Sequence, residues 1–182
     1  MIMNFSQLLE NLIEDTFPGS LVMFSPELVL CATIVVLLLV RLVNLDRKLP
    51  AYWITLAGTV CSFILAYVQF LQFGERIETE IYFTGMLVYD QFTVFLRLFL
   101  LLFLILVVAL TVISGIPDSE DGPDFYTLLL GATIGMMMMA GANHLLILFL
   151  GIEMTSVPSY VMVGFLKGRR LSSEAALKYV VY

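Results

Sequence analysis

The chain has 182 residues, of which 60% are hydrophobic and 13% are charged, and its formal net charge is −6. This composition is typical of a protein with several membrane-spanning segments and excludes an ordinary soluble domain. The negative charge argues against a nucleic-acid partner, so the expected surroundings are a lipid bilayer and other membrane proteins.

Residues 1–24 form the first predicted segment. Apolar side chains recur there at helical spacing with acidic residues among them, which predicts a short amphipathic helix on the membrane surface or against a partner. A disordered N-terminus is the alternative. The first 20 residues contain no Lys or Arg, so they lack the positive region of a cleavable signal peptide.

Six helix starts can be counted after this segment, which predicts an all-α, polytopic transmembrane bundle. Ser25 is the expected N-cap of the first helix, followed by Pro26 and by Glu27 near the positive end of the helix dipole. Ser172 is the expected cap of the last. The predicted helices are Ser25 to about Asn44, Ala51 to Phe73, Val88 to Ser114, Phe125 to Ala142, Leu145 to Leu166, and Ser173 onward.

The sixth helix has only about ten residues, too few to span a bilayer. The chain is therefore predicted to be a fragment of a larger bundle. Its parts are residues 1–24, residues 25–124 with the first three spans and their loops, and residues 125–182. Polar loops are expected at 74–80 and 117–124.

Lys and Arg side chains predict the orientation in the membrane. The connections after the first and fifth helices hold six of them, whereas the opposite side holds only Arg76. The positive-inside rule then places the six in the cytoplasm and the N-terminus outside.

No metal site and no cofactor site are predicted in this chain. Cys31 and Cys61 fall in apolar spans and are expected to be buried free thiols. His144 lies at a predicted helix boundary, and the run from Met136 to Met139 is interpreted as adaptable packing. Gly131 and Gly135 have GxxxG spacing, which permits close helix packing but is common by chance.

Glu153 is the most informative residue in the sequence. It is the one charged residue between Leu145 and Leu166, about 14 Å from His144 along a helix and so near the middle of a bilayer. A carboxylate there costs roughly 2.5–3.5 kcal/mol, so the default interpretation is an ion or proton site facing a bundle interior with a cation nearby. The alternative is a protonated group that hydrogen-bonds a neighbouring helix.

Pro158 and the surrounding hydroxyls support a hydrated pocket beside Glu153. The proline removes a backbone donor and frees the carbonyl of Met154. Thr155, Ser156 and Ser159 supply hydroxyls at that place, as broken transmembrane helices require. An ordinary proline kink is the alternative.

Besides Glu153, Arg97 and Lys178 lie within or close to the predicted spans. Asp90 and Arg97 share a helix face, so they could pair through a third group, or Arg97 could extend to the outer surface. Lys178 is four residues after Glu174 and about 9 Å along the helix from Ser172. It either pairs with Glu174 at the cytoplasmic surface or faces Glu153 across the last two helices.

The stretch FYTLLLGATIGMMMMAGANHLLILFLGIEMTSVPSYVMVGF, followed by SSEAALKYVVY, resembles the antiporter-like proton-translocating subunits of respiratory complex I. It is most similar to the subunit N (subunit 2) family of bacterial NADH-quinone oxidoreductase. The combination of LFLGIE, the following proline and EAALKY carries the resemblance, and SPELVL and YDQF extend it to the first and third helices.

The resemblance implies a fold of two inverted five-helix repeats, with residues 125–182 beginning the antiporter-like domain. It implies that Glu153 and Lys178 act in proton translocation, and that His144 has no site role because relatives often carry an aspartate there. It implies a place in a bacterial plasma membrane beside other membrane-arm subunits. Partner subunits elsewhere in the complex would carry FMN and iron–sulfur clusters and bind quinone. The alternatives are a subunit of a multi-subunit cation/proton antiporter and a structural subunit without transport.

Overall fold

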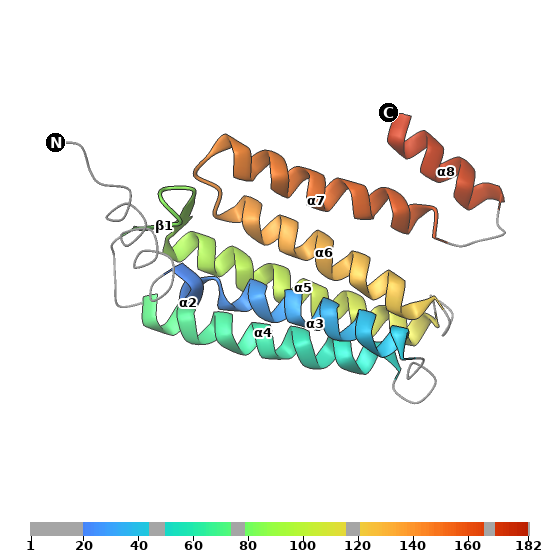
Figure 1. Cartoon of the computed structure of the whole chain (residues 1–182), viewed down its shortest axis with the longest axis horizontal. Helices are drawn as coiled ribbons and strands as arrows, with labels where there is room; N and C mark the ends of the chain where they lie inside the picture. Colours follow the sequence, from blue (N-terminus) through green and yellow to red (C-terminus); the bar gives the residue numbers. More distant parts are fainter. Residues whose placement is uncertain (1–19, 44–49, 74–78, 116–120, 166–169, 182) are drawn as a thin grey trace.

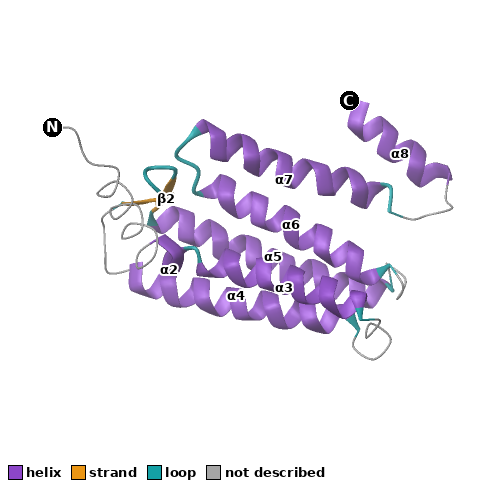
Figure 2. Ribbon diagram, in the orientation of Figure 1, coloured by secondary structure: helices purple, strands orange, loops and turns teal. Residues whose placement is uncertain are grey.

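The computed structural model describes residues 20–43, 50–73, 79–115, 121–165 and 170–181. Long helices dominate it and lie side by side (Figures 1 and 2), which confirms the predicted all-α, polytopic fold. The elements are α2 (Leu21–Met23), α3 (Ser25–Leu42), α4 (Ala51–Phe73), β1 (Glu80–Tyr82), β2 (Leu87–Tyr89), α5 (Gln91–Ser114), α6 (Gly122–Ala140), α7 (Leu145–Val163) and α8 (Arg170–Val181). The prediction of an amphipathic helix near the N-terminus falls on residues outside the described ranges.

Among the described helices, α3, α4, α5 and α7 are long and apolar enough to cross a membrane. Helix α6 packs against α3, α4 and α5 on one side and against α7 on the other. Its buried side is rich in small residues, and its side chains join α3, α4 and α5 in one hydrophobic core that includes Leu30, Ala66, Leu101, Leu130 and Met137.

Helix α7 lies at the edge of this bundle, as Figure 1 shows, and α8 lies beyond it. Only 6% of the spanning window of α7 is buried, against 22–28% in the other three spans. Most of its leucine, isoleucine and phenylalanine side chains therefore face outward, as expected of a helix surrounded by lipid or by further helices.

A β-hairpin that the sequence analysis missed stands at one end of the bundle. Strands β1 and β2 pair antiparallel, and Phe83, Thr84 and Gly85 turn the chain with positive φ angles of 52°, 55° and 90°. The Val88 amide donates to Gly141 O at 2.9 Å, and the Asn143 amide donates to Met86 O at 3.0 Å. The hairpin is thus bonded to the connection between α6 and α7.

Several predicted helix starts or N-caps are wrong. Helix α5 begins at Gln91 and not at Val88, because Asp90 is extended and its carboxylate accepts the Thr93 amide at 2.7 Å. Ser25 lies inside α3 after Phe24, and no side-chain hydrogen bond caps that helix. Ser172 lies inside α8, where its hydroxyl donates to Val163 O of α7 at 2.8 Å.

An ion pair between Arg41 and Asp124 joins the end of α3 to the first turn of α6, so these two ends lie on the same side of the bundle. The predicted loop 117–124 ends earlier than expected, because α6 already begins at Gly122. Most of the cations behind the predicted orientation lie outside the described residues. The location of the N-terminus outside the cell stays a prediction.

Candidate functional site

Helix α7 carries Glu153 and is continuous from Leu145 to Val163 with Pro158 inside it. His144 caps its first turn, because Nδ1 accepts the Leu146 amide at 3.2 Å. This capping role explains a histidine at that boundary. Within the described residues, no cluster of three or more His, Cys, Asp or Glu side chains could hold a metal ion.

The hydroxyls near Pro158 are bonded mainly within α7. Thr155 donates to Gly151 O at 2.8 Å, Ser159 donates to Ser156 O at 2.6 Å, and Ser156 donates to Ile152 O. Thr155 also reaches Ala132 O of α6 at 3.4 Å. Such back-bonding satisfies hydroxyls in an apolar surrounding and favours bending of a helix. It places polar atoms on α7 within two turns of Glu153.

Helices α6 and α7 approach each other closely at a pair of glycines. A Cβ atom on Gly135 would lie 2.7 Å from Thr155 Oγ1 and 2.9 Å from Gly151 O. A Cβ atom on Gly151 would lie 2.5 Å from Met139 Cγ, whereas one on Gly131 would meet nothing within 4 Å. The close contact therefore joins Gly135 to Gly151, and Gly131, the other half of the GxxxG spacing, takes no part in it.

This packing fixes the direction of Glu153. Gly151 faces α6, and two residues along a helix correspond to about 200° around its axis. Glu153 therefore points away from α6 and is exposed in the described chain. The interior-facing orientation expected from the sequence is not present among the described helices, because α7 lies at the edge of the bundle.

Helix α8 covers part of the same face of α7. Tyr160 is seven residues after Glu153 and so lies on its side of the helix. The Tyr160 ring meets the Tyr179 ring of α8 edge to face, with centroids 5.1 Å apart. Helix α8 thus lies on the face that carries Glu153, about two turns farther along α7.

Lys178 directly precedes Tyr179 and forms an ion pair with Glu174 at 2.8 Å, with both side chains exposed. The two residues are one helical turn apart, the arrangement that stabilises exposed helices by a few tenths of a kcal/mol. Among the described residues this is the pairing of Lys178, and the alternative pairing with Glu153 is not formed.

Arg97 is fully buried and does not extend to the surface, so the snorkelling interpretation is wrong. Its guanidinium forms an ion pair with Glu27 of α3 and donates to the Tyr89 hydroxyl of β2. Its Cζ atom also lies 4.0 Å from the centroid of the Tyr89 ring, a cation–π contact. Asp90 caps α5, and the described residues show no direct pairing between Asp90 and Arg97.

The sequence analysis missed Glu27 as the partner of Arg97. Helices α3 and α5 both begin at the hairpin end, and each charge lies within the first two turns of its helix. Opposite charges within the first two turns of two helices that start at the same end of the bundle are the signal that could have matched them. Burial raises the pKa of Tyr89, which lies in the hairpin, so this hydroxyl is protonated at neutral pH.

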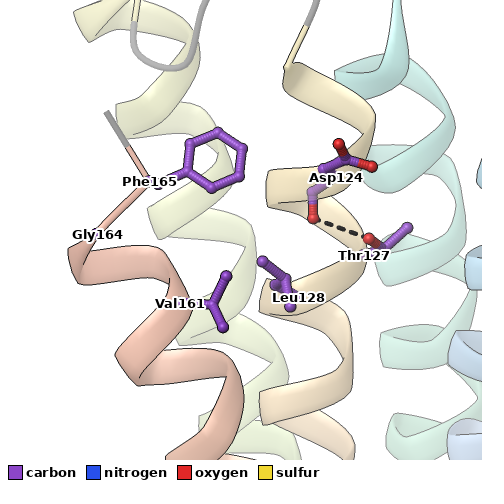
Figure 3. Close-up of a pocket in the computed structure, with 6 residues that line it drawn as sticks. All are labelled: Asp124, Thr127, Leu128, Val161, Gly164 and Phe165. Atoms are coloured by element: carbon purple, nitrogen blue, oxygen red, sulfur yellow. Dashed lines mark hydrogen bonds between the residues drawn. The ribbon is translucent and has the colours of Figure 1, made fainter. Parts of the chain in front are cut away.

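A pocket of 370 Å³ lies between the start of α6 and the end of α7, at the end opposite the hairpin. Figure 3 shows its lining, in which Leu128, Val161 and Phe165 are apolar and the Thr127 hydroxyl donates to Asp124 O at 2.8 Å. The Asp124 carboxylate is already engaged by Arg41. The lining offers no free charged group, so we assign it no chemistry.

Comparison with known proteins places the chain in context. Residues 142–182 match the family described as NADH:quinone oxidoreductase/Mrp antiporter, TM. The chain is 33% identical over 165 residues to NADH-quinone oxidoreductase subunit N 2 of Chloroherpeton thalassium, covering 87% of this chain and 31% of the relative. It is 36% identical over 166 residues to subunit N 1 of Koribacter versatilis, covering 86% and 32%.

A structural relative agrees. A chain of respiratory complex I from Thermus thermophilus superimposes with a TM-score of 0.64 and 25% sequence identity, covering 86% of this chain and 32% of that one. The present chain spans about a third of the length of the relatives it matches. Over 86–87% of its own length, the chain is thus similar to part of subunit N of NADH-quinone oxidoreductases.

Proposed function

We propose that this chain is part of a proton-translocating subunit in the membrane arm of a bacterial NADH-quinone oxidoreductase. It would lie in the plasma membrane with its N-terminus outside, and residues 125–182 would begin its antiporter-like domain. Other membrane-arm subunits are its expected partners. FMN, iron–sulfur clusters and the quinone site belong to partner subunits, and this chain itself carries no redox chemistry.

The position of Glu153 is the observation that carries the proposal. Its carboxyl group lies near the middle of an apolar helix that is long enough to cross a bilayer. A charge at that depth costs roughly 2.5–3.5 kcal/mol, and such residues mark ion and proton paths by default. The face of α7 that carries Glu153 turns away from α6. The relatives are longer than this chain, and their further helices have room to pack on that face.

Lys178 is the second residue in the proposed path. A carboxylate releases its proton more readily when a cation approaches it, and takes the proton back when the cation withdraws. The Tyr160–Tyr179 contact holds α8 against the Glu153 face of α7. We therefore assign Lys178 the role of a mobile cation that exchanges between Glu174 and the neighbourhood of Glu153.

Glu153→Gln in the full-length subunit, assembled in the complex, tests the proposal. Proton pumping is expected to fall severely in inverted membrane vesicles while assembly is retained, because glutamine keeps the shape but cannot carry a proton. Glu80→Gln in the hairpin is the matched control, since that carboxylate lies outside the spans. Unchanged pumping in Glu153→Gln would instead support a structural subunit without transport.

A cation/proton antiporter is the second candidate function, because the matched family description also names the Mrp antiporter. The same glutamate would then serve sodium exchange. Copurification of the full-length protein with flavin and iron–sulfur proteins supports the oxidoreductase. Sodium-dependent proton movement in their absence supports the antiporter.

A further inference from the structure

Buried polar side chains gather at the hairpin end of the bundle, where α3, α4 and α5 meet. Glu27, Gln69 and Arg97 come from these three helices, and Tyr89 comes from β2. The exposed fractions of Glu27 and Arg97 are 0%, and that of Gln69 is 6%. This group, the hairpin-end cluster, is separate from Glu153 because α6 packs between α7 and the three helices.

A break in the helix before α3 explains part of the cluster. Pro26 has no N–H, so the carbonyl of Val22 lacks the donor that a continuous helix would supply. The side-chain amide nitrogen of Gln69 replaces it, donating to Val22 O at 3.1 Å and to Met23 O at 3.2 Å. Gln69 therefore supplies a donor to backbone carbonyls at the helix break, which explains a polar side chain in the core.

Arg97 also donates a hydrogen bond to the carbonyl of Met23. Its Nη1 atom donates to Met23 O at 3.4 Å, so one backbone oxygen accepts from both Gln69 and Arg97. Through its ion pair, Arg97 also brings Glu27 to this place. Three long polar side chains from three helices thus converge around Met23.

Three atoms of the cluster have no hydrogen-bond partner among the described residues. They are Glu27 Oε2, Gln69 Oε1 and Arg97 Nε, two acceptors and one donor; a fourth atom, Glu27 Oε1, also lacks a hydrogen bond but lies in the ion pair with Arg97. Each such buried atom costs about 1–3 kcal/mol when it stays unsatisfied, and more when the group is charged. Native proteins leave few groups in that state.

Charge balance limits what can bond these atoms. Arg97 disfavours a metal cation and Glu27 disfavours an anion, because the pair as a whole is neutral. A ligand must both donate to the two oxygens and accept from the guanidinium. Water does this, and buried waters make about three such hydrogen bonds.

We propose that the hairpin-end cluster is a binding site for ordered internal water, which bridges Glu27, Gln69 and Arg97 within the membrane-embedded bundle. The site is independent of the proposed proton path through Glu153. It would give the first three spans a hydrated, charge-neutral site at their hairpin end, beside the hydrophobic core.

Radiolytic footprinting of the assembled complex tests the site, because radicals formed from bound water oxidise side chains beside it. Tyr89 touches Arg97, whereas Tyr126 lies in the hydrophobic core, and the two are 0% and 5% exposed. Tyr89 is expected to be oxidised several times faster than Tyr126. Equal rates would overturn the proposal.

Gln69→Leu removes one bridging acceptor and is expected to slow oxidation of Tyr89 without changing Tyr126. An unchanged rate at Tyr89 in that variant would count against the bridge. If the Gln69→Leu variant does not assemble, a high-resolution density map of the unmodified complex tests the water site instead. Water peaks within hydrogen-bond distance of Glu27 Oε2 and Gln69 Oε1 support the site, and a side chain from another segment in that place refutes it.

Discussion

Glu27 and Arg97 form a fully buried ion pair between the first turn of α3 and the second turn of α5. The pair ties together two helices that both start at the hairpin end. Its members are costly to bury singly, so each requires the other.

Arg97→Met is therefore expected to destabilise the subunit by about 3–5 kcal/mol, because it leaves the Glu27 charge buried and unpaired. Thermal unfolding of the full-length subunit in detergent measures the loss. Adding Glu27→Gln to Arg97→Met is expected to restore most of it. Two losses that simply add would contradict the pairing.

Arg41→Met is the matched control for this experiment. Its ion pair with Asp124 is 42% and 35% exposed, so the expected cost is at most about 1 kcal/mol.

The α6–α7 contact predicts different effects of two alanine substitutions on stability. Gly151→Ala places a methyl group 2.5 Å from Met139 Cγ and 2.9 Å from the Gly135 carbonyl, which is backbone and cannot move aside easily. Overpacking of this kind costs about 1–3 kcal/mol. Gly131→Ala meets nothing within 4 Å and is expected to be neutral. Melting temperatures of the two variants check this, and an equal effect would show that the close approach is not at Gly151.

The stabilisation that the Asp90 cap gives to α5 is expected to depend on pH. Hydrogen bonding from Thr93, through its side chain and its backbone amide, lowers the pKa of Asp90 below its ordinary value of 3.8. A lowered carboxyl pKa stabilises the fold above the unfolded value, and that contribution is lost as the pH falls through the folded value. Asp90→Ala is expected to cost about 1 kcal/mol at pH 7 and less near pH 3.

Asp90→Asn separates charge from capping, because asparagine caps helices about as well without titrating. Its stability relative to Asp90→Ala should change little between the two pH values. A difference between wild type and Asp90→Ala that stays constant with pH would exclude the carboxylate as the cause.

The apolar helices could be predicted closely because each is a long, local pattern. Helix α4 runs from Ala51 to Phe73 as predicted. The hairpin was missed because its strands have three residues each and are held by bonds to the α6–α7 connection. No local pattern contains those bonds.

The partners and directions of charged side chains could not be predicted from local sequence either. Glu27 already had a sufficient local explanation at a helix start, so its pairing with Arg97 could not be inferred from that position alone. Glu153 could be located in depth from sequence, whereas its direction depends on which side of α7 Gly151 faces. Partner choice is a property of packing, which the spacing of residues along one helix does not determine.

The proposed role of Lys178 predicts that its ion pair with Glu174 matters little for stability and that the lysine matters for transport. Glu174→Gln is expected to change stability by no more than about 0.5 kcal/mol, because the pair is exposed and one turn apart. Lys178→Met is expected to lower proton pumping in the assembled complex strongly, since it removes the mobile cation from the face of α7 that carries Glu153. Melting temperatures and pumping rates of both variants measure the two effects separately. Full pumping by Lys178→Met would show that Lys178 forms only a surface ion pair and that another cation is the partner of Glu153.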